Sequence, residues 1–120
     1  MNEVTNAESE TAEEYCTRLY PETVSEFKKI QKEMLSTFYR KQRNYGSDNI
    51  SVGTALLTPD HIKLSLTGIW FRINDKIQRL KQMVLLGEPD EVGESVEDSF
   101  QDLSVYGIIS QIVLRGKWAK

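Results

Sequence analysis

The sequence has 120 residues and a formal net charge of −3, a size that fits one domain near the lower limit for a fold that is stable alone. The negative charge is concentrated in the first fourteen residues, which hold five Glu and no Lys or Arg, so the remainder has fifteen basic and thirteen acidic side chains. A nearly neutral remainder argues against binding duplex DNA by bulk electrostatic attraction, whereas a small anionic ligand is compatible with it.

Cysteine and histidine chemistry is limited, because Cys16 is the only Cys and His61 is the only His. A single Cys cannot form an intramolecular disulfide, and these two residues alone cannot build a zinc site. No apolar run reaches the ~20 residues of a membrane span, and the N-terminus lacks the basic-then-apolar pattern of a signal peptide. We therefore expect a protein of the reducing cytoplasm with no membrane partner.

The acidic N-terminal segment, residues 1–14, is polar and has almost no large apolar side chains. It cannot bury enough surface to offset the entropy lost on ordering, so we expect a disordered tail. The remainder, residues 15–120, is expected to form a single helical domain. Because this domain is small, we expect pairing with a second copy to help stabilise it, as a dimer.

The first long helix is predicted from Pro21 to Asn44. A proline suits the first helical position, Glu22 suits the positive end of the helix dipole, and Gly46 is a natural stop. Lysines and arginines elsewhere on this helix have the pattern of a solvated face, so we do not expect a nucleic-acid partner. The apolar residues recur three and four positions apart, as in an amphipathic helix: Val24, Phe27, Ile30, Met34, Leu35 and Phe38.

The central helix is predicted from Thr58 to Leu86, after a connection over residues 44–58 that has no helical period. This connection is either a plain crossover between helices or a functional loop. Thr58 is the predicted N-cap and Pro59 the first helical residue. Apolar residues then repeat as in the seam of a helical bundle: Ile62, Leu66, Ile69, Ile73, Ile77, Leu80 and Val84.

The last helix is predicted from Ser95 to about Arg115, with Asp98 in the capping-box position. Its second half, Val105 to Leu114, is apolar on nearly every side, so we expect other helices or another subunit to enclose it. No stretch has the alternation of a β-strand. We therefore predict an all-α bundle of three long helices with small additions.

Charged residues beside the apolar seam of the central helix are candidates for ligand binding. A rotation of about 100° per residue places four of them on one arc: Arg72, Asp75, Lys76 and Arg79. An arc that borders a seam faces the crevice between helices, where helical bundles bind ligands. These charges either form a salt-bridge ladder along the helix or use Arg72, Lys76 and Arg79 to hold the phosphates of a ligand.

The start of the last helix carries an acidic stripe of Glu94, Asp98 and Asp102, spaced four positions apart. Capping and the helix dipole account for Glu94 and Asp98 but not for Asp102. If the central helix packs alongside, Asp75 can join Asp98 and Asp102 around Mg²⁺ or Mn²⁺, with Glu94 as a further ligand. The alternative is a structural ion pair with an arginine of the central helix.

Aromatic residues near these charges are candidates for stacking on a base. Tyr45 and Tyr106 have this role in our interpretation, although aromatic side chains at helical spacing are more often part of a core. No residue is assigned a catalytic role.

A set of short motifs in fixed order, within roughly Lys28 to Arg115, resembles the nucleotide modification associated domain 1 family. The shared pieces are Tyr45-Gly46, Gly68, Arg72 to Lys76, Arg79-Leu80, Glu94 to Val96, Asp98, Asp102-Leu103 and Tyr106. Proteins of this family are small and often phage-encoded, so the resemblance implies a role in modified-nucleotide metabolism, in the host cytoplasm if a phage encodes the chain. It also implies a site formed by Tyr45, Gly46, Arg72, Asp75, Lys76, Arg79, Glu94, Asp98, Asp102 and Tyr106.

The chain is similar, more weakly, to the all-α nucleoside triphosphate pyrophosphohydrolases of the MazG and dimeric dUTPase kind. Those proteins carry Glu-x-x-Glu on one helix and Glu-x-x-Asp on the next, and the carboxylates bind Mg²⁺. Here Arg72 and Asp75 stand at the first spacing, and the last helix offers either Ser99 with Asp102 at the second spacing or Asp98 four positions before Asp102. Several carboxylates are thus absent or displaced, and the likeness implies a reduced metal site or none.

Two functions follow as expectations. The first is a nucleotide-binding protein whose most concrete reaction is Mg²⁺-dependent or Mn²⁺-dependent hydrolysis of a (deoxy)nucleoside triphosphate to the monophosphate. The second is a non-enzymatic phage accessory or inhibitory protein that binds a host or replication protein. The expected partners are a nucleotide, a second copy of the chain and, in the second case, another protein.

Overall fold

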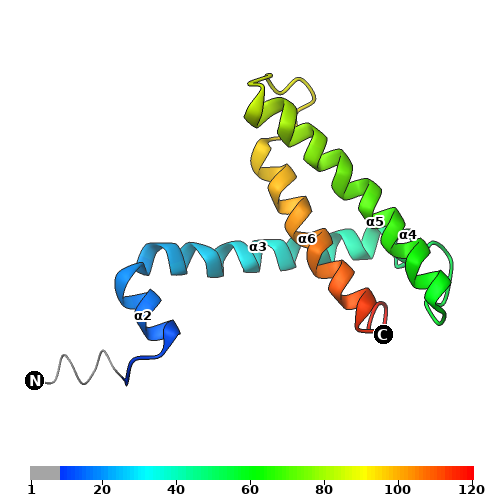
Figure 1. Cartoon of the computed structure of the whole chain (residues 1–120), viewed down its shortest axis with the longest axis horizontal. Coiled ribbons are helices and arrows are strands. Elements are labelled where there is room, and N and C mark those ends of the chain that lie inside the picture. The colour runs from blue at the N-terminus through cyan, green and yellow to red at the C-terminus, as the bar shows by residue number, and fades with distance from the viewer. Residues whose placement is uncertain (1–8) are drawn as a thin grey trace, which may run out of the picture. The chain divides into compact units, whose positions relative to one another are not determined.

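The computed structural model describes residues 9–120, and no strand occurs among them (Figure 1). The helices are α2 (Ala12–Leu19), α3 (Pro21–Tyr45), α4 (Asp48–Ser51), α5 (Pro59–Leu80) and α6 (Val96–Leu114), and α5 is continued by the π-helix η1 (Lys81–Leu85). The predicted all-α fold with three long helices is therefore confirmed by α3, α5 and α6. The chain divides into two compact units, residues 1–37 and 38–120.

The first unit contains α2 and the larger part of α3, and its first helix begins inside the segment that we predicted as a tail. Thr11 forms a capping box with Glu14, whose backbone N–H donates to the Thr11 hydroxyl at 3.1 Å. Arg18, in the last turn of α2, pairs at 2.8 Å with Glu10, which precedes the helix. The sequence signal for this start, Thr followed three residues later by Glu, is local. The predicted tail over residues 1–8 lies outside the described residues.

The second unit is built on a hairpin of α5 and α6, which lie side by side in antiparallel directions (Figure 1). Both predicted N-caps are present. The Thr58 hydroxyl accepts a hydrogen bond from the His61 backbone N–H at 3.2 Å. The Ser95 hydroxyl accepts one from the Asp98 backbone N–H at 3.0 Å. The last turn of the central helix widens into η1, where the Leu86 N–H bonds to the Lys81 carbonyl at 3.1 Å. Gly87 then adopts a φ of 72°, which ends the helix.

The connection after α3 is not a plain crossover, because the short helix α4 inserts Ile50 into the core. The buried apolar residues come from four different segments and are Ile50, Ile69, Ile109, Val113 and Trp118. Ser65, fully buried on α5, donates its hydroxyl to the Ile50 carbonyl at 2.6 Å and so fixes α4 against the hairpin.

The predicted apolar surfaces are only partly covered within one chain. In the seam of α5, Ile69 is buried, whereas Ile77 and Val84 near the other end are 42% and 53% exposed. In the second half of α6, Ile109 is buried, whereas Leu114 is 64% exposed. Helices of the same chain therefore enclose this segment only in part, and its enclosure by another subunit stays a prediction. Among residues 9–120, none of the helices has the length and hydropathy of a membrane span.

Candidate functional site

Charged side chains of α5 face acidic residues that lie before and within α6. The sequence predicted such contacts, and they are made by Lys76 and Arg79 of α5 and by Glu94 and Asp102 of the acidic stripe. The Lys76 ammonium lies 2.6 Å from a Glu94 carboxylate oxygen and 3.1 Å from one of Asp102. Arg79 pairs with Asp90 at 2.9 Å and also donates to the Glu94 backbone carbonyl. We refer to these five residues, Lys76, Arg79, Asp90, Glu94 and Asp102, as the ion-pair cluster.

The cluster holds Lys76 in its charged form. Partial burial alone would lower the pKa of this ammonium, but the hydrogen bonds and charges of Glu94 and Asp102 outweigh it, so the pKa of Lys76 is raised. The pKa of Asp90 is lowered by the backbone N–H of Val92 and by the hydrogen bond from Arg79. Both shifts favour the ionised pairs, which connect the loop before α6 to α5.

The four predicted metal ligands are not brought together. Asp75 is exposed on α5, and Asp98 turns back to accept from the Ser95 backbone N–H at 3.2 Å. Glu94 and Asp102 do approach each other, but the Lys76 ammonium occupies the place between them that a cation would take. Among residues 9–120 no group of three His, Cys, Asp or Glu side chains is placed to hold a metal ion. Mg²⁺ or Mn²⁺ binding has no geometric support from this donor set.

The role of Asp98 as a cap gives a direct prediction. We expect Asp98→Ala to lower the free energy of unfolding by about 0.5–2 kcal/mol, because it removes a capping hydrogen bond. Urea unfolding followed by circular dichroism measures this change. The control is Glu97→Ala, the exposed neighbouring acid in the same turn. Equal stability of the two variants would contradict the capping role.

A cavity of about 380 Å³ opens beside the ion-pair cluster, within residues 38–120. Four residues predicted for the site line it: Tyr45, Arg72, Asp102 and Tyr106. The remaining lining residues, which the sequence analysis did not single out for a site, are Phe38, Lys41, Gln42, Asn49, Ile50, Gln101, Val105, Ile109 and Trp118. Lys76 and Arg79, predicted to hold phosphate, are engaged in the cluster and do not line the cavity.

The polar groups of the cavity are arranged by contacts between distant segments. Arg72 of α5 donates to the Asn49 carbonyl at 2.7 Å, and Lys41 of α3 lies 3.4 Å from Asp102 of α6. The side-chain oxygen of Asn49 is buried and has no hydrogen-bond partner within the described chain. The cavity therefore combines two cations and one carboxylate.

Aromatic rings form the apolar part of the cavity. Trp118 is buried and meets Phe38 edge-on, with ring centroids 6.2 Å apart and an interplanar angle of 72°. Tyr45 is 67% exposed and Tyr106 is half-buried, so a ligand can reach both rings. The one sequence signal for Trp118 is a large apolar residue after the helix stop at Gly116.

Comparisons with known proteins leave the resemblance to the nucleotide modification family as a prediction. No protein-family model, no curated protein and no solved structure matches the chain.

Proposed function

We propose that residues 38–120 bind a nucleotide, with the base and sugar in the cavity and the phosphate at its cationic groups. The observation that carries this proposal is the lining of the cavity by aromatic rings together with Arg72 and Lys41. Sites for small molecules are mostly apolar and hold a few convergent polar groups, in volumes of roughly 300–1,000 Å³. The cavity, at about 380 Å³, lies within that range.

The phosphate is assigned to Arg72 and Lys41. One Arg72 nitrogen is used by the Asn49 carbonyl, which leaves the other donors of the guanidinium for a ligand oxygen. Lys41 is exposed, and its 3.4 Å contact with Asp102 is long for an ion pair, so an incoming phosphate can compete for it.

The base is assigned to the aromatic side of the cavity. Tyr45 and Tyr106 offer faces for stacking. The resemblance to a family of modified-nucleotide metabolism supports the same ligand class. Hydrolysis is not part of the proposal, because Lys76 separates the carboxylates that a metal would need.

The test measures binding of nucleosides, nucleoside monophosphates and nucleoside triphosphates to the full chain by calorimetry and thermal shift. We expect monophosphates to bind and the corresponding nucleosides to bind at least tenfold more weakly, because the phosphate contacts are lost. Arg72→Gln should reduce monophosphate affinity by tenfold or more.

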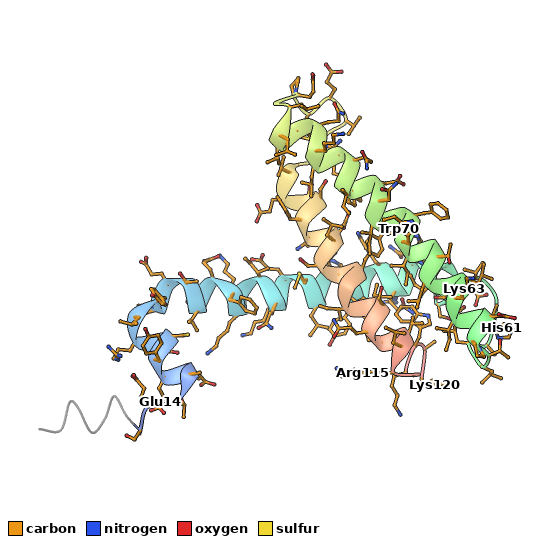
Figure 2. The ribbon with its side chains drawn as sticks, viewed as in Figure 1. Glu14, His61, Lys63, Trp70, Arg115 and Lys120 are labelled. Carbon is orange, nitrogen blue, oxygen red and sulfur yellow. The ribbon has the colours of Figure 1, made fainter. Side chains whose placement is uncertain are left out.

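The matched control for this test is Arg115→Gln, an exposed arginine at the end of α6 outside the cavity (Figure 2). It should bind like the wild type. No binding by any nucleotide, or unchanged affinity in a folded Arg72→Gln variant, would remove the proposal. In a separate measurement, the triphosphates are incubated with the chain and Mg²⁺ or Mn²⁺, and analysis of the products tests whether the chain hydrolyses them.

A second candidate function, a non-enzymatic accessory protein that binds another protein, draws on a different observation. An open apolar groove of about 350 Å³ runs along the end of the α5 seam, lined by Ile77, Leu80, Lys81, Val84, Leu85 and Phe100. Grooves of this kind accept the apolar face of a helix. This function predicts that Val84→Asp leaves nucleotide affinity unchanged while it abolishes binding of the partner.

A further inference from the structure

One acidic side chain lies in the cavity that we assign to a nucleotide. Among the described residues that line this cavity, Asp102 is the single acid, and its side chain is 21% exposed. A carboxylate repels a phosphate, so the phosphate contacts leave Asp102 without a role. An ionised carboxylate accepts hydrogen bonds and cannot donate one, so Asp102 suits a ligand group that donates.

Two lysines from different helices hold the Asp102 carboxylate. Its Oδ2 lies 3.1 Å from the ammonium of Lys76 on α5, and its Oδ1 lies 3.4 Å from the ammonium of Lys41 on α3. Lys41 lines the cavity and Lys76 does not. Lys76 is itself held by Glu94 at 2.6 Å, so it acts as a positioning residue for Asp102. Oδ2 is therefore bound on the side away from the cavity, and Oδ1 is the oxygen that a ligand can reach.

Along the cavity, Asp102 lies between the groups assigned to the phosphate and to the base. Lys41, assigned to the phosphate, is the neighbour of Oδ1. Tyr106, assigned to the base, follows Asp102 by four residues on α6, which is one helical turn or about 6 Å along the axis. In a nucleotide the sugar lies between the phosphate and the base. Oδ1 of Asp102 is thus placed beside the sugar.

We infer that Asp102 binds the sugar of the nucleotide and selects ribose over 2′-deoxyribose. The 2′ and 3′ hydroxyls of ribose are adjacent donors, and a carboxylate oxygen has two lone-pair sites to accept from them once a phosphate has drawn Lys41 away. A 2′-deoxyribose offers only the 3′ hydroxyl. Hydrogen bonds to a charged acceptor are about twice as strong as neutral ones, so the loss of one is large. The ligand class is a ribonucleoside monophosphate.

This inference rests on the proposed function, because it assigns one part of the same nucleotide site. The two can still fail separately. The proposed function requires that nucleotides bind, whereas the inference requires a preference between two sugars.

The first experiment changes the ligand and leaves the protein intact. Calorimetry on the full chain compares the 5′-monophosphates of adenosine, guanosine, cytidine and uridine with their 2′-deoxy forms. We expect each ribonucleotide that binds to do so about tenfold or more tightly than its 2′-deoxy form, because a hydrogen bond to a charged acceptor is lost. Equal affinity for the two sugars would overturn the inference and leave the proposed function standing. No binding of either form would remove both.

The second experiment tests whether Asp102 is the residue that selects the sugar. In Asp102→Ala the ratio of the two affinities should fall to about twofold or less, because no charged acceptor remains for the 2′ hydroxyl. The ratio cancels any general effect of the substitution on phosphate affinity, since both ligands carry the same phosphate. Asp102→Asn keeps the shape of the side chain and a neutral acceptor, so its ratio should lie between those of the wild type and Asp102→Ala.

The matched control is Asp75→Ala, an exposed acid of α5 that does not line the cavity. It should keep the ribose preference of the wild type. Circular dichroism verifies that all three variants keep their helices.

A folded Asp102→Ala variant that keeps the ribose preference would overturn the inference. So would a variant that loses a preference among the four bases while its preference for ribose is unchanged, because Oδ1 would then accept from an N–H of the base.

Discussion

Truncation of Trp118 to alanine is expected to lower the free energy of unfolding by about 3–5 kcal/mol, although the residue lies beyond the last helix. The side chain is only 6% exposed and packs edge-on against Phe38. Its indole N–H donates to the Ser47 carbonyl at 3.1 Å. One side chain thus joins α3 and the turn before α4 to the end of α6, and its removal leaves a cavity that several segments share.

The measurement is urea unfolding followed by circular dichroism, which does not depend on the tryptophan that is removed. Trp70→Ala is the control, because Trp70 is 54% exposed on α5 (Figure 2). Its replacement should lower the free energy of unfolding far less. Trp118→Phe keeps most of the ring packing and removes only the indole hydrogen bond, because the Ser47 carbonyl still accepts from the backbone N–H groups of Ile50 and Ser51, so a smaller loss of about 0.5–1.5 kcal/mol is expected. A Trp118→Ala variant as stable as Trp70→Ala would show that the contacts of Trp118 do not hold these segments together.

The elements that local sequence determines were predicted well. Thr58 and Ser95 have the side chains that cap a helix, and each begins its helix where expected. The helix stop at Gly87 follows equally from its neighbours. Local hydrogen bonds and glycine conformations act within a few residues, so periodicity and caps suffice to find them.

Elements that depend on distant contacts were not predicted. The four-residue helix α4 is too short for a periodic signal, and Ser65 and Ile50 fix it through a bond across fifteen positions. Trp118 likewise contacts residues more than seventy positions away. No pattern within a short window contains such partners.

In the candidate site, too, some features follow from local sequence and others depend on distant contacts. The arcs of α5 and α6 predicted that their charges would face each other, and Lys76 and Arg79 do contact Glu94. Which acid would take which partner was not predictable, because Asp98 is drawn into a local cap and Arg72 turns to a carbonyl of α4. Local and distant partners compete for these side chains, so the sequence alone does not determine which contacts form.

Reversal of the charge at Lys76 is expected to cause the second large loss in the free energy of unfolding. Lys76→Glu would place a third carboxylate between those of Glu94 and Asp102, where the ammonium now lies 2.6 and 3.1 Å from them. The side chain of Lys76 is 21% exposed, so solvent weakens the repulsion only in part, and we expect a loss of about 2–4 kcal/mol at neutral pH. Mutual repulsion raises the pKa of clustered carboxylates in the folded variant, so this loss should shrink as the pH falls and the acids are protonated.

The neutral variant Lys76→Met isolates the contribution of the ammonium through its pH dependence. Because the pKa of Lys76 is raised in the folded chain, its contribution is fully present below the unfolded-state value of about 10.4 and is lost as the pH rises through the folded-state value. The stability difference between wild type and Lys76→Met should therefore be constant near neutral pH and fall above about pH 10.

Lys63→Glu is the control for these changes, since Lys63 is exposed near the start of α5 (Figure 2). It should shift stability by no more than about 0.5 kcal/mol. A Lys76→Glu variant no less stable than Lys63→Glu, or a difference between wild type and Lys76→Met that persists unchanged at high alkaline pH, would contradict a stabilising ammonium.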